Sequence, residues 1–428
     1  MTDLNQEFEK AVAYELTDED IERAKLLIGV DTPSRRREHV SVATPDAIRN
    51  WALGMGDDNP LHVDESYGPT TRWGDQVASP TFIGHIKTPL RGDPVPEEIA
   101  KATKGLFRGI HVFVSGGTWD FYRHVYPGDR LYAFSGLESV ETKESEFAGR
   151  SVVQVSRSAI FNQRVEVVGV YRVLTINTAR KESRDRGKYK DIEPASYTDA
   201  DIAAIDEIYA AEEPRGAQKR YWEDVKVGDE LRPMVKGPLT VTEIIAFHAG
   251  GYGFVPYGLR SSRVGYKNRS RIKPFYIKNE LGVPDVAQRL HWDSAWAQAI
   301  GNPMAYDYGV MRQAWFQHQV TDWMGDDGVL LRLEDSIRKF NYQGDTQFLH
   351  ASVVDKRVEE TQGHVVDIEL TMTNQRDVET AYGKATVGLP SRESGLPLFA
   401  EVPRELAQKT TQMWARHVEL SHGTGAAV

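Results

Sequence analysis

The most informative segment of the chain reads Gly56-Asp57-Asp58-Asn59-Pro60-Leu61-His62. It follows a predicted amphipathic helix that has Thr44 as its cap and Pro45 at its first position. The Asn-Pro turn could bring Asp57 and His62 to one point, where an acid and an imidazole polarise a single water or hydroxyl group. An isolated Asp/His pair is more often a plain turn with a surface histidine, so the motif needs support from the rest of the chain.

An internal repeat supplies that support. The turn Gly128-Asp129 returns as Gly344-Asp345, 216 residues later, and an Asn-Gln-Arg tripeptide is repeated at an offset of 212 residues. The helix start at residues 44–54 parallels residues 240–250 at an offset of only 196, so the second copy must carry an insertion. Several matches in the same order predict two related domains in tandem.

Both copies place helical patterns before strand patterns. After Gly309 the apolar residues recur near helical period as far as a Gly-Asp-Asp-Gly turn at residues 325–328. Residues 366–373 alternate strictly between apolar and polar side chains, as in a half-buried antiparallel strand, and residues 150–161 and 166–174 are the expected equivalents in the first copy. This order predicts an α+β fold in which antiparallel sheets each wrap a long central helix.

The repeat and the local composition divide the chain into four segments. A charged stretch between the copies is predicted to be a solvated linker, followed by a helix that ends before Pro214. The end of the chain carries a predicted docking helix from Arg404 to Glu419. The segments are an N-terminal domain at residues 1–178, a linker at 179–218, a C-terminal domain at 219–393 and a tail at 394–428.

Composition excludes several classes of function. The formal net charge of -10, from 62 acidic and 52 basic residues, argues against a nucleic-acid-binding protein. The absence of cysteine removes disulfide scaffolds, thiolate metal sites and cysteine nucleophiles. The histidines and acids do not show the spacing of a zinc or calcium site, so we expect no metal. No apolar run approaches the roughly 18 residues of a membrane span, and we expect a soluble cytoplasmic protein.

The pattern Gly-Asp-x-Asn-Pro-aliphatic-His at residues 56–62 resembles the signature of the (R)-specific enoyl-CoA hydratases, the MaoC-like dehydratases of the hot-dog fold. Residues 77–82 resemble the segment that enters the central helix in this family, and residues 119–129 resemble its strand and Pro-Gly-Asp turn. In the second half, residues 291–309 resemble the family's His-x-Asp…Gly…Ala-His-Gly block. The resemblance covers roughly residues 15–178 and 219–391.

The resemblance implies a double hot-dog fold and a hydro-lyase reaction. Members of this family hydrate trans-2-enoyl thioesters to (R)-3-hydroxyacyl thioesters, or catalyse the reverse dehydration, without a metal or redox cofactor. The substrate would be an acyl-CoA or an acyl-carrier-protein thioester, so coenzyme A enters only as part of the substrate. Neither a nucleic acid nor a membrane is implied, and the chain could form a homodimer.

The resemblance also implies a role for individual residues. Asp57 and His62 would form the acid–base dyad that acts on the water, and Asn59 would hold the loop or its water. The thioester oxygen, which becomes negative in the transition state, requires donors at a helix N-terminus. The implied donors are the amides around Thr81 and Phe82 in the first half and Gly309 in the second.

The second copy of the motif is incomplete. It retains His291, but Val286 stands where the first half has its acid, five residues before the histidine. Gln288 and Arg289 replace the asparagine and proline of the motif. We therefore predict a catalytically reduced second half, in which Asp307 is a helix cap.

The insertion of about 33 residues between Gly250 and His291 is unusually basic. It begins with a glycine-rich aromatic stretch and continues with six bases and no acid. One interpretation is a clamp for the phosphates of coenzyme A or for an acidic carrier protein; the other is a solvated surface loop. The six bases are Arg260, Arg263, Lys267, Arg269, Arg271 and Lys273.

Two further functions remain open. The hot-dog fold also occurs in thioesterases, so the chain could hydrolyse acyl-CoA instead. It could also be a non-catalytic acyl-binding partner subunit that stabilises another dehydratase. The complete Asp57, Asn59 and His62 set argues against the second alternative, because a binding module does not need it.

Overall fold

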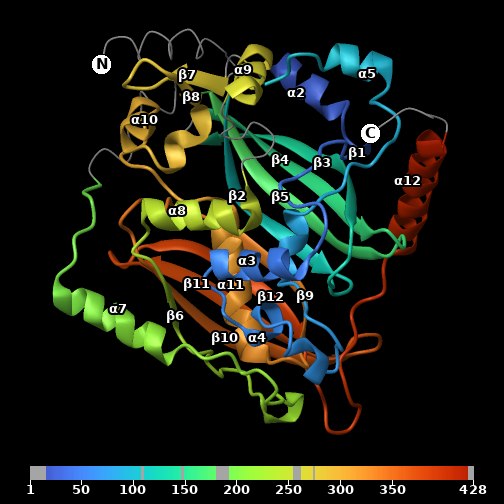
Figure 1. The fold of residues 1–428 in the computed structure, drawn as a ribbon, viewed down its shortest axis with the longest axis vertical. Coiled ribbons are helices and arrows are strands. Elements are labelled where there is room, and N and C mark those ends of the chain that lie inside the picture. Colours follow the sequence, from blue (N-terminus) through green and yellow to red (C-terminus); the bar gives the residue numbers. More distant parts are fainter. Residues whose placement is uncertain are drawn as a thin grey trace.

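The computed structural model describes residues 16–107, 110–145, 149–179, 192–253, 262–272 and 275–422. Among these residues, ten strands form one antiparallel sheet, which is the frame of the protein (Figure 1). The first half contributes β1 (Thr32–Pro33), β2 (Ile110–Phe121), β3 (Leu131–Ser145), β4 (Gly149–Asn162) and β5 (Val167–Ala179). The second half contributes β6 (Met234–Lys236), β9 (Val329–Ile337), β10 (Gln347–Glu359), β11 (Gly363–Asn374) and β12 (Glu379–Gly388).

The order of the strands shows the repeat. The sheet runs β1-β3-β4-β5-β2-β9-β12-β11-β10-β6, so both halves have the same order when followed outward from the centre. The two halves join where Gly116–Asp120 of β2 pairs antiparallel with Arg332–Ser336 of β9. The tandem repeat seen in the sequence is therefore a structural repeat, and the predicted strands of both copies are present.

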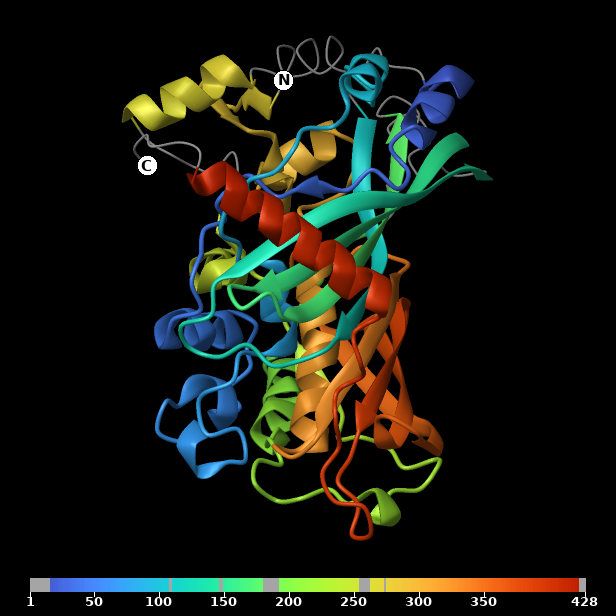
Figure 2. The same cartoon turned by 90° about the vertical axis from the view of Figure 1, so that its right-hand side faces the viewer.

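The long helix of the second half is α11 (Gly309–Met324), as predicted. All its residues from Met311 to Met324 are buried, because α11 is enclosed between the sheet of the second half and the helical segments opposite it (Figures 1 and 2). A helix that is buried on every side is expected in the interior of a domain. Gly325, whose φ is 72°, ends α11 at the predicted turn.

The described residues of the first half contain no matching long helix, so the prediction of a long helix in each half is wrong there. Its place is taken by η2 (Pro80–Gly84), a 3-10 helix of five residues. The following residues leave the helical path because the amides of Lys87 and Thr88 donate to the carbonyls of Val40 and Leu131. Prolines at positions 89, 94 and 96 would also interrupt any longer helix.

The equivalent helices at the start of each half meet face to face. They are α3 (Pro45–Gly54) in the first half and α8 (Val241–Phe247), continued by the π-helical η4 (His248–Tyr252), in the second. Thr44 and Thr240 cap them, as predicted from the sequence. A Cβ atom on Gly250 would lie 2.9 Å from the Cα of Gly54, so the two helices approach so closely only because both positions are glycine.

The remaining elements connect and cover this frame. The predicted linker helix is α7 (Asp199–Ala211), and the insertion in the second half contains α9 (Ser262–Arg271) and the hairpin β7 (Tyr276–Lys278) and β8 (Pro284–Val286). No helix within the described ranges is long and apolar enough to cross a bilayer. The smaller helices are α2 (Asp18–Lys25), α4 (Pro60–Val63), η1 (Gly68–Thr70), α5 (Glu97–Ala102), η3 (Trp222–Asp224), η6 (Ala287–His291) and α10 (Ser294–Ala299).

The tail helix α12 (Arg404–His422) returns to the first half of the chain. Figure 2 shows it lying across the strands of the first half. The Trp414 ring lies 5.0 Å from that of Tyr132 and 6.1 Å from that of Phe161, and Arg416 pairs with Asp93. The tail therefore covers the sheet of the N-terminal half, although it follows the C-terminal half in sequence.

Candidate active site

The predicted catalytic motif lies in the loop between α3 and α4. The side chain of Asn59 accepts the amide of Leu61 at 3.0 Å and so caps α4. The carboxylate of Asp57 accepts the amide of Asn59 at 3.1 Å. Asn59 therefore holds the loop, and Asp57 is fixed at the turn that leads into His62.

The ring of His62 is held by one nitrogen and unpaired at the other. Nδ1 donates to the carbonyl of Val77 at 2.7 Å, whereas Nε2 is buried and has no hydrogen-bond partner. A neutral ring that donates through Nδ1 leaves Nε2 as a proton acceptor. Asp57 is 1% exposed and His62 is 3% exposed. The pair is thus an interior acid and an interior base that do not hydrogen-bond to one another.

The second half repeats the histidine but not the acid. Nδ1 of His291 donates to the carbonyl of Tyr306 at 2.8 Å, and the two residues are 15 positions apart, as are His62 and Val77. Burial lowers the pKa of His291 to about 3, so the ring is neutral at pH 7. The acid position is the buried apolar Val286, which agrees with the predicted loss of catalytic groups.

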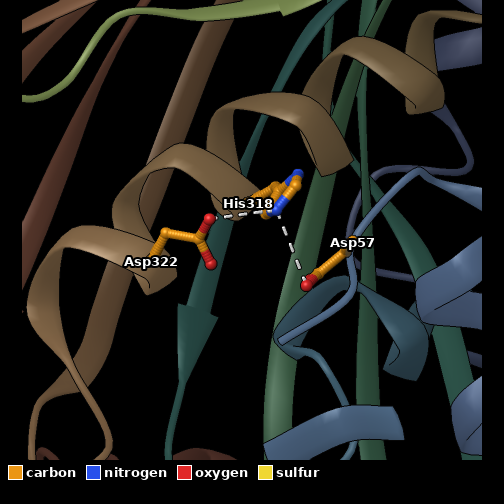
Figure 3. Close-up of side chains that lie close together, drawn as sticks. All are labelled: Asp57, His318 and Asp322. Atoms are coloured by element: carbon orange, nitrogen blue, oxygen red, sulfur yellow. Dashed lines mark ion pairs between the residues drawn. The ribbon is translucent and has the colours of Figure 1, made fainter. Parts of the chain in front are cut away.

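Three side chains of the second half surround Asp57, and sequence reasoning missed all three. Figure 3 shows His318 of α11 between Asp57 and Asp322, with Nε2 at 3.7 Å from the Asp57 carboxylate and 3.2 Å from that of Asp322. On the other side of the ring, Nδ1 lies 2.9 Å from Nζ of Lys236. The available signal was a pair of polar residues one turn apart, at positions 318 and 322, in a helix otherwise predicted to be buried.

Burial shifts the pKa values of His318, Asp322 and Lys236. It lowers the pKa of His318 to about 3, with Lys236 as the second cause, so the ring is neutral at pH 7. Its contacts with the two carboxylates are therefore those of a neutral imidazole. Burial raises the pKa of Asp322 to about 7. Burial also lowers the pKa of Lys236, against the opposing effect of Glu212 and Asp57.

The geometry alone would admit a cation here, but the donor set does not favour one. Asp57, His318 and Asp322 each offer a ligand atom, and these atoms lie within 4.8 Å of one another. A histidine that binds a metal through Nε2 usually donates its Nδ1–H to an acceptor. Nδ1 of His318 instead faces the ammonium of Lys236, which has no lone pair to offer. The residues fit a hydrogen-bonded network better than a metal site.

The predicted oxyanion donors of the first half stand at the start of the short 3-10 helix η2. The amide of Phe82 donates to the carbonyl of Ser79 at 3.0 Å, so the prediction that Phe82 offers a free donor is wrong. This hydrogen bond belongs to the short 3-10 helix itself, so the amide is not available to a ligand. The hydroxyl of Thr81 is likewise engaged, since it donates to Gln317 at 3.0 Å. Gly309, in contrast, begins the 16-residue helix α11.

Gly309 opens onto a cavity of about 630 Å³ between the two halves. His291 stacks on Tyr308 at one wall with a centroid distance of 3.6 Å, and Gln288 donates to the Tyr308 hydroxyl. The first-half sheet contributes Val112, Phe113, Val114, Ser115, Lys143, Ser151, Ile176 and Thr178 to the lining.

The equivalent cavity of the first half is closed. It measures only about 10 Å³ and is lined by Pro80, Phe121 and Arg123, where the large cavity has Gly309, Ile337 and Lys339. Phe399 of the tail lines it as well, with its ring 4.9 Å from that of His124. The cavity beside η2 is therefore small, and the cavity beside the start of α11 is large.

Asp307 does not cap α11, so that prediction is wrong. The N-cap residue of α11 is Tyr308, which makes no side-chain capping bond. Asp307 instead forms a bidentate pair with Arg312, with distances of 2.7 and 2.8 Å, and accepts a further bond from Asn341. Both members of the ion pair are 2% exposed at the side chain. Asp307 faces Arg312 one turn into the helix instead of the first amides of α11.

The predicted phosphate-binding residues lie apart from the cavity wall. Arg263, Lys267, Arg269 and Arg271 are exposed on α9, and Arg260 and Lys273 lie outside the described residues. A different set of cations, which sequence reasoning did not identify, lines the large cavity. These are Lys143, Arg312, Arg338 and Lys339.

Sequence comparisons find known proteins that are similar to parts of this chain. Residues 27–170 match the dehydratase domain region of FAS1-like proteins. The chain is 26% identical over 200 residues to a probable enoyl-CoA hydratase alpha subunit of Thermomonospora curvata, a match that covers 44% of this chain and 61% of the relative. It is 29% identical over 111 residues, 26% of this chain and 67% of the relative, to a UPF0336 protein of Streptomyces avermitilis.

Solved structures share the fold. A MaoC-like dehydratase superposes with a TM-score of 0.56 and 14% identity over 88% of this chain and all of that chain. A Mycobacterium tuberculosis protein with a double hotdog fold superposes with a TM-score of 0.50 and 11% identity over 86% of this chain and 97% of that one. The predicted double hot-dog fold is confirmed.

Proposed function

We propose that the chain is a MaoC-like hot-dog dehydratase that hydrates trans-2-enoyl thioesters to (R)-3-hydroxyacyl thioesters, or catalyses the reverse dehydration; its similarity to hydratases and dehydratases supports this. Asp57 and His62 form the acid–base pair. The observation that carries the proposal is the complete motif at residues 56–62, in which Nε2 of His62 is fixed, buried and unpaired beside a buried acid. A base prepared in this way needs a proton donor, and a water molecule bound there would supply one.

The proposed reaction needs one proton removed and one delivered. The dyad takes a proton from water as its oxygen adds to C3 of the enoyl group, and the protonated dyad then returns a proton to C2. Negative charge develops on the thioester oxygen between these events, where a nearby donor lowers the barrier. The backbone amide of Thr81 remains the first-half candidate for this donor, since the Phe82 amide and the Thr81 hydroxyl are already engaged.

We propose that Phe399, which lines the small cavity of the first half beside His124, limits access to the dyad. An aromatic contact of the kind seen with His124 is worth about 0.5–1.5 kcal/mol. Replacing Phe399 by alanine is therefore expected to raise kcat/KM by up to about tenfold. Steady-state kinetics would test this, with Leu398→Ala as the matched control because Leu398 is exposed. Equal kinetics for wild type and Phe399→Ala would contradict a covering role.

For the coenzyme A part of the substrate, we propose that the exposed bases of α9 bind the phosphates. The double substitution Arg263→Glu with Lys267→Glu is expected to raise KM for an enoyl-CoA by about tenfold, because charge-assisted contacts to phosphate would be lost. KM for the matching pantetheine thioester, which lacks the nucleotide, should not change. An equal rise in KM for both thioesters would contradict this proposal. A rise in KM only for Arg338→Glu would instead place the coenzyme A phosphates at the cavity.

A second candidate function is supported by one specific observation. The open cavity adjoins His291 and Gly309 instead of the dyad, so the chain could hold an acyl thioester there without converting it. In that case the protein would be a non-catalytic acyl-binding subunit of another dehydratase. It would bind saturated acyl-CoA in calorimetry and would show no turnover.

One assay separates these functions. The chain is incubated with trans-2-enoyl-CoA, and the absorbance of the conjugated thioester and the release of free thiol are followed together. Loss of the absorbance without free thiol is expected for hydration. Thiol release would indicate a thioesterase, and binding without either change would indicate the acyl-binding subunit.

A further inference from the structure

A lysine from the second half reaches the catalytic loop of the first. Lys236, the last residue of β6, is 6% exposed. Its Nζ donates to the carbonyl of Gly56 at 3.1 Å, next to Asp57, and lies 2.9 Å from Nδ1 of His318. A buried ammonium is costly unless acceptors and negative charge surround it. Lys236 therefore belongs to the same buried network as the catalytic acid.

His318 links this lysine to the acids. Because an ammonium only donates, Nδ1 of His318 is the acceptor, and the neutral ring carries its proton on Nε2. Nε2 lies 3.7 Å from Oδ1 of Asp57 and 3.2 Å from the carboxylate of Asp322, without a hydrogen bond to either. The ring therefore packs against the same carboxylate oxygen of Asp57 that accepts the amide of Asn59.

We propose that Lys236 and His318 are positioning residues for Asp57: Lys236 holds the backbone of the catalytic loop at Gly56 and supplies a positive charge near Asp57, and the His318 ring packs against the Asp57 carboxylate. The inference rests on the proposed function of the Asp57/His62 pair. It gives the second half a part in the chemistry of the first, because β6 and α11 together hold the acid. It also accounts for two buried polar side chains that the core does not require.

The charged surroundings of Lys236 come from three elements. Glu212 follows α7, Asp57 and Asp58 lie in the catalytic loop, and Asp322 is on α11. Burial raises the pKa of Asp322 to about 7, so Asp322 is partly protonated near neutral pH and counts less as a partner. Glu212 and Asp58 also lie near the lysine. Removing Lys236 should therefore change the electrostatic environment of these two carboxylates as well as that of Asp57.

The kinetic test compares removal with conservative replacement. Lys236→Met and His318→Leu are expected to lower kcat by at least about tenfold with little change in KM, whereas Lys236→Arg and His318→Gln retain a cation and a donor and should recover much of the loss. In Lys236→Met the acid limb of the kcat/KM profile should move to higher pH, because a nearby positive charge favours an ionised acid. Gln319→Leu is the matched control, because Gln319 is equally buried on α11 but bonds to Arg232 and Leu349.

A thermal double-substitution cycle tests the pairing without any activity. Lys236→Met should lower Tm in the wild-type background and lower it clearly less in the Asp57→Asn background, because the lysine then has a weaker partner. Gln319→Leu should lower Tm equally in both backgrounds. Additive effects of Lys236→Met and Asp57→Asn would overturn the inference. Coupling in the cycle, together with an Asp57→Asn variant as active as wild type, would instead overturn the proposed function.

Discussion

Replacement of His62 by alanine is expected to lower kcat/KM for a trans-2-enoyl thioester by about 10²- to 10⁴-fold, the usual contribution of a general acid or base. The ring has no structural bond at Nε2, so alanine removes the base while losing only the Nδ1 bond to Val77. The measurement is steady-state hydration followed by loss of the conjugated absorbance. Circular dichroism of the variant would show that the fold is retained.

The internal repeat offers a matched comparison for this variant. His291→Ala removes the equivalent ring and the equivalent Nδ1 bond in the half that lacks the acid. It is expected to lower kcat/KM by less than about tenfold, whereas Asp57→Asn should resemble His62→Ala. A larger loss in His291→Ala than in His62→Ala would move the reaction to the open cavity of the second half.

Asp307→Asn is expected to lower the free energy of unfolding by about 3–5 kcal/mol, the usual cost of breaking a buried ion pair from one side. The substitution leaves the guanidinium of Arg312 buried at the start of α11 without its counter-charge. The remaining acceptors of Arg312 are the backbone carbonyls of Lys339 and Thr380. Urea denaturation would measure the change.

The control for this variant is an ion pair at the surface. Lys101 and Glu97 pair on α5 with side chains that are 74% and 80% exposed. Lys101→Ala is expected to leave the denaturation midpoint nearly unchanged, because exposed pairs contribute little. If Lys101→Ala and Asp307→Asn lowered the free energy of unfolding by similar amounts, burial would not explain the contribution of the Asp307 pair to stability.

The sequence was sufficient for the features that depend on local periodicity and on repetition. Strict alternation at residues 366–373 marked a strand of the final sheet, and helical spacing after Gly309 marked α11. The internal repeat predicted two related domains in tandem. The motif at residues 56–62 located an acid and a base that are both buried in the structure.

Features that depend on distant contacts could not be predicted in this way. The short η2 replaces a long helix because the following amides find partners at Val40 and Leu131, which lie far away in sequence. Lys236 and His318 belong to no motif and reach Asp57 only because the two halves are packed together. Phe399 likewise lines the small cavity of the first half only because the tail returns to that half.

The decisive measurement is the identity of the product formed by the wild-type chain from trans-2-enoyl-CoA in water labelled with heavy oxygen. Chiral chromatography and mass spectrometry would identify the product across several acyl chain lengths. The proposed reaction predicts an (R)-3-hydroxyacyl-CoA that carries one oxygen atom from the solvent. Recovery of unchanged enoyl-CoA, or of a free acid with released coenzyme A, would contradict it.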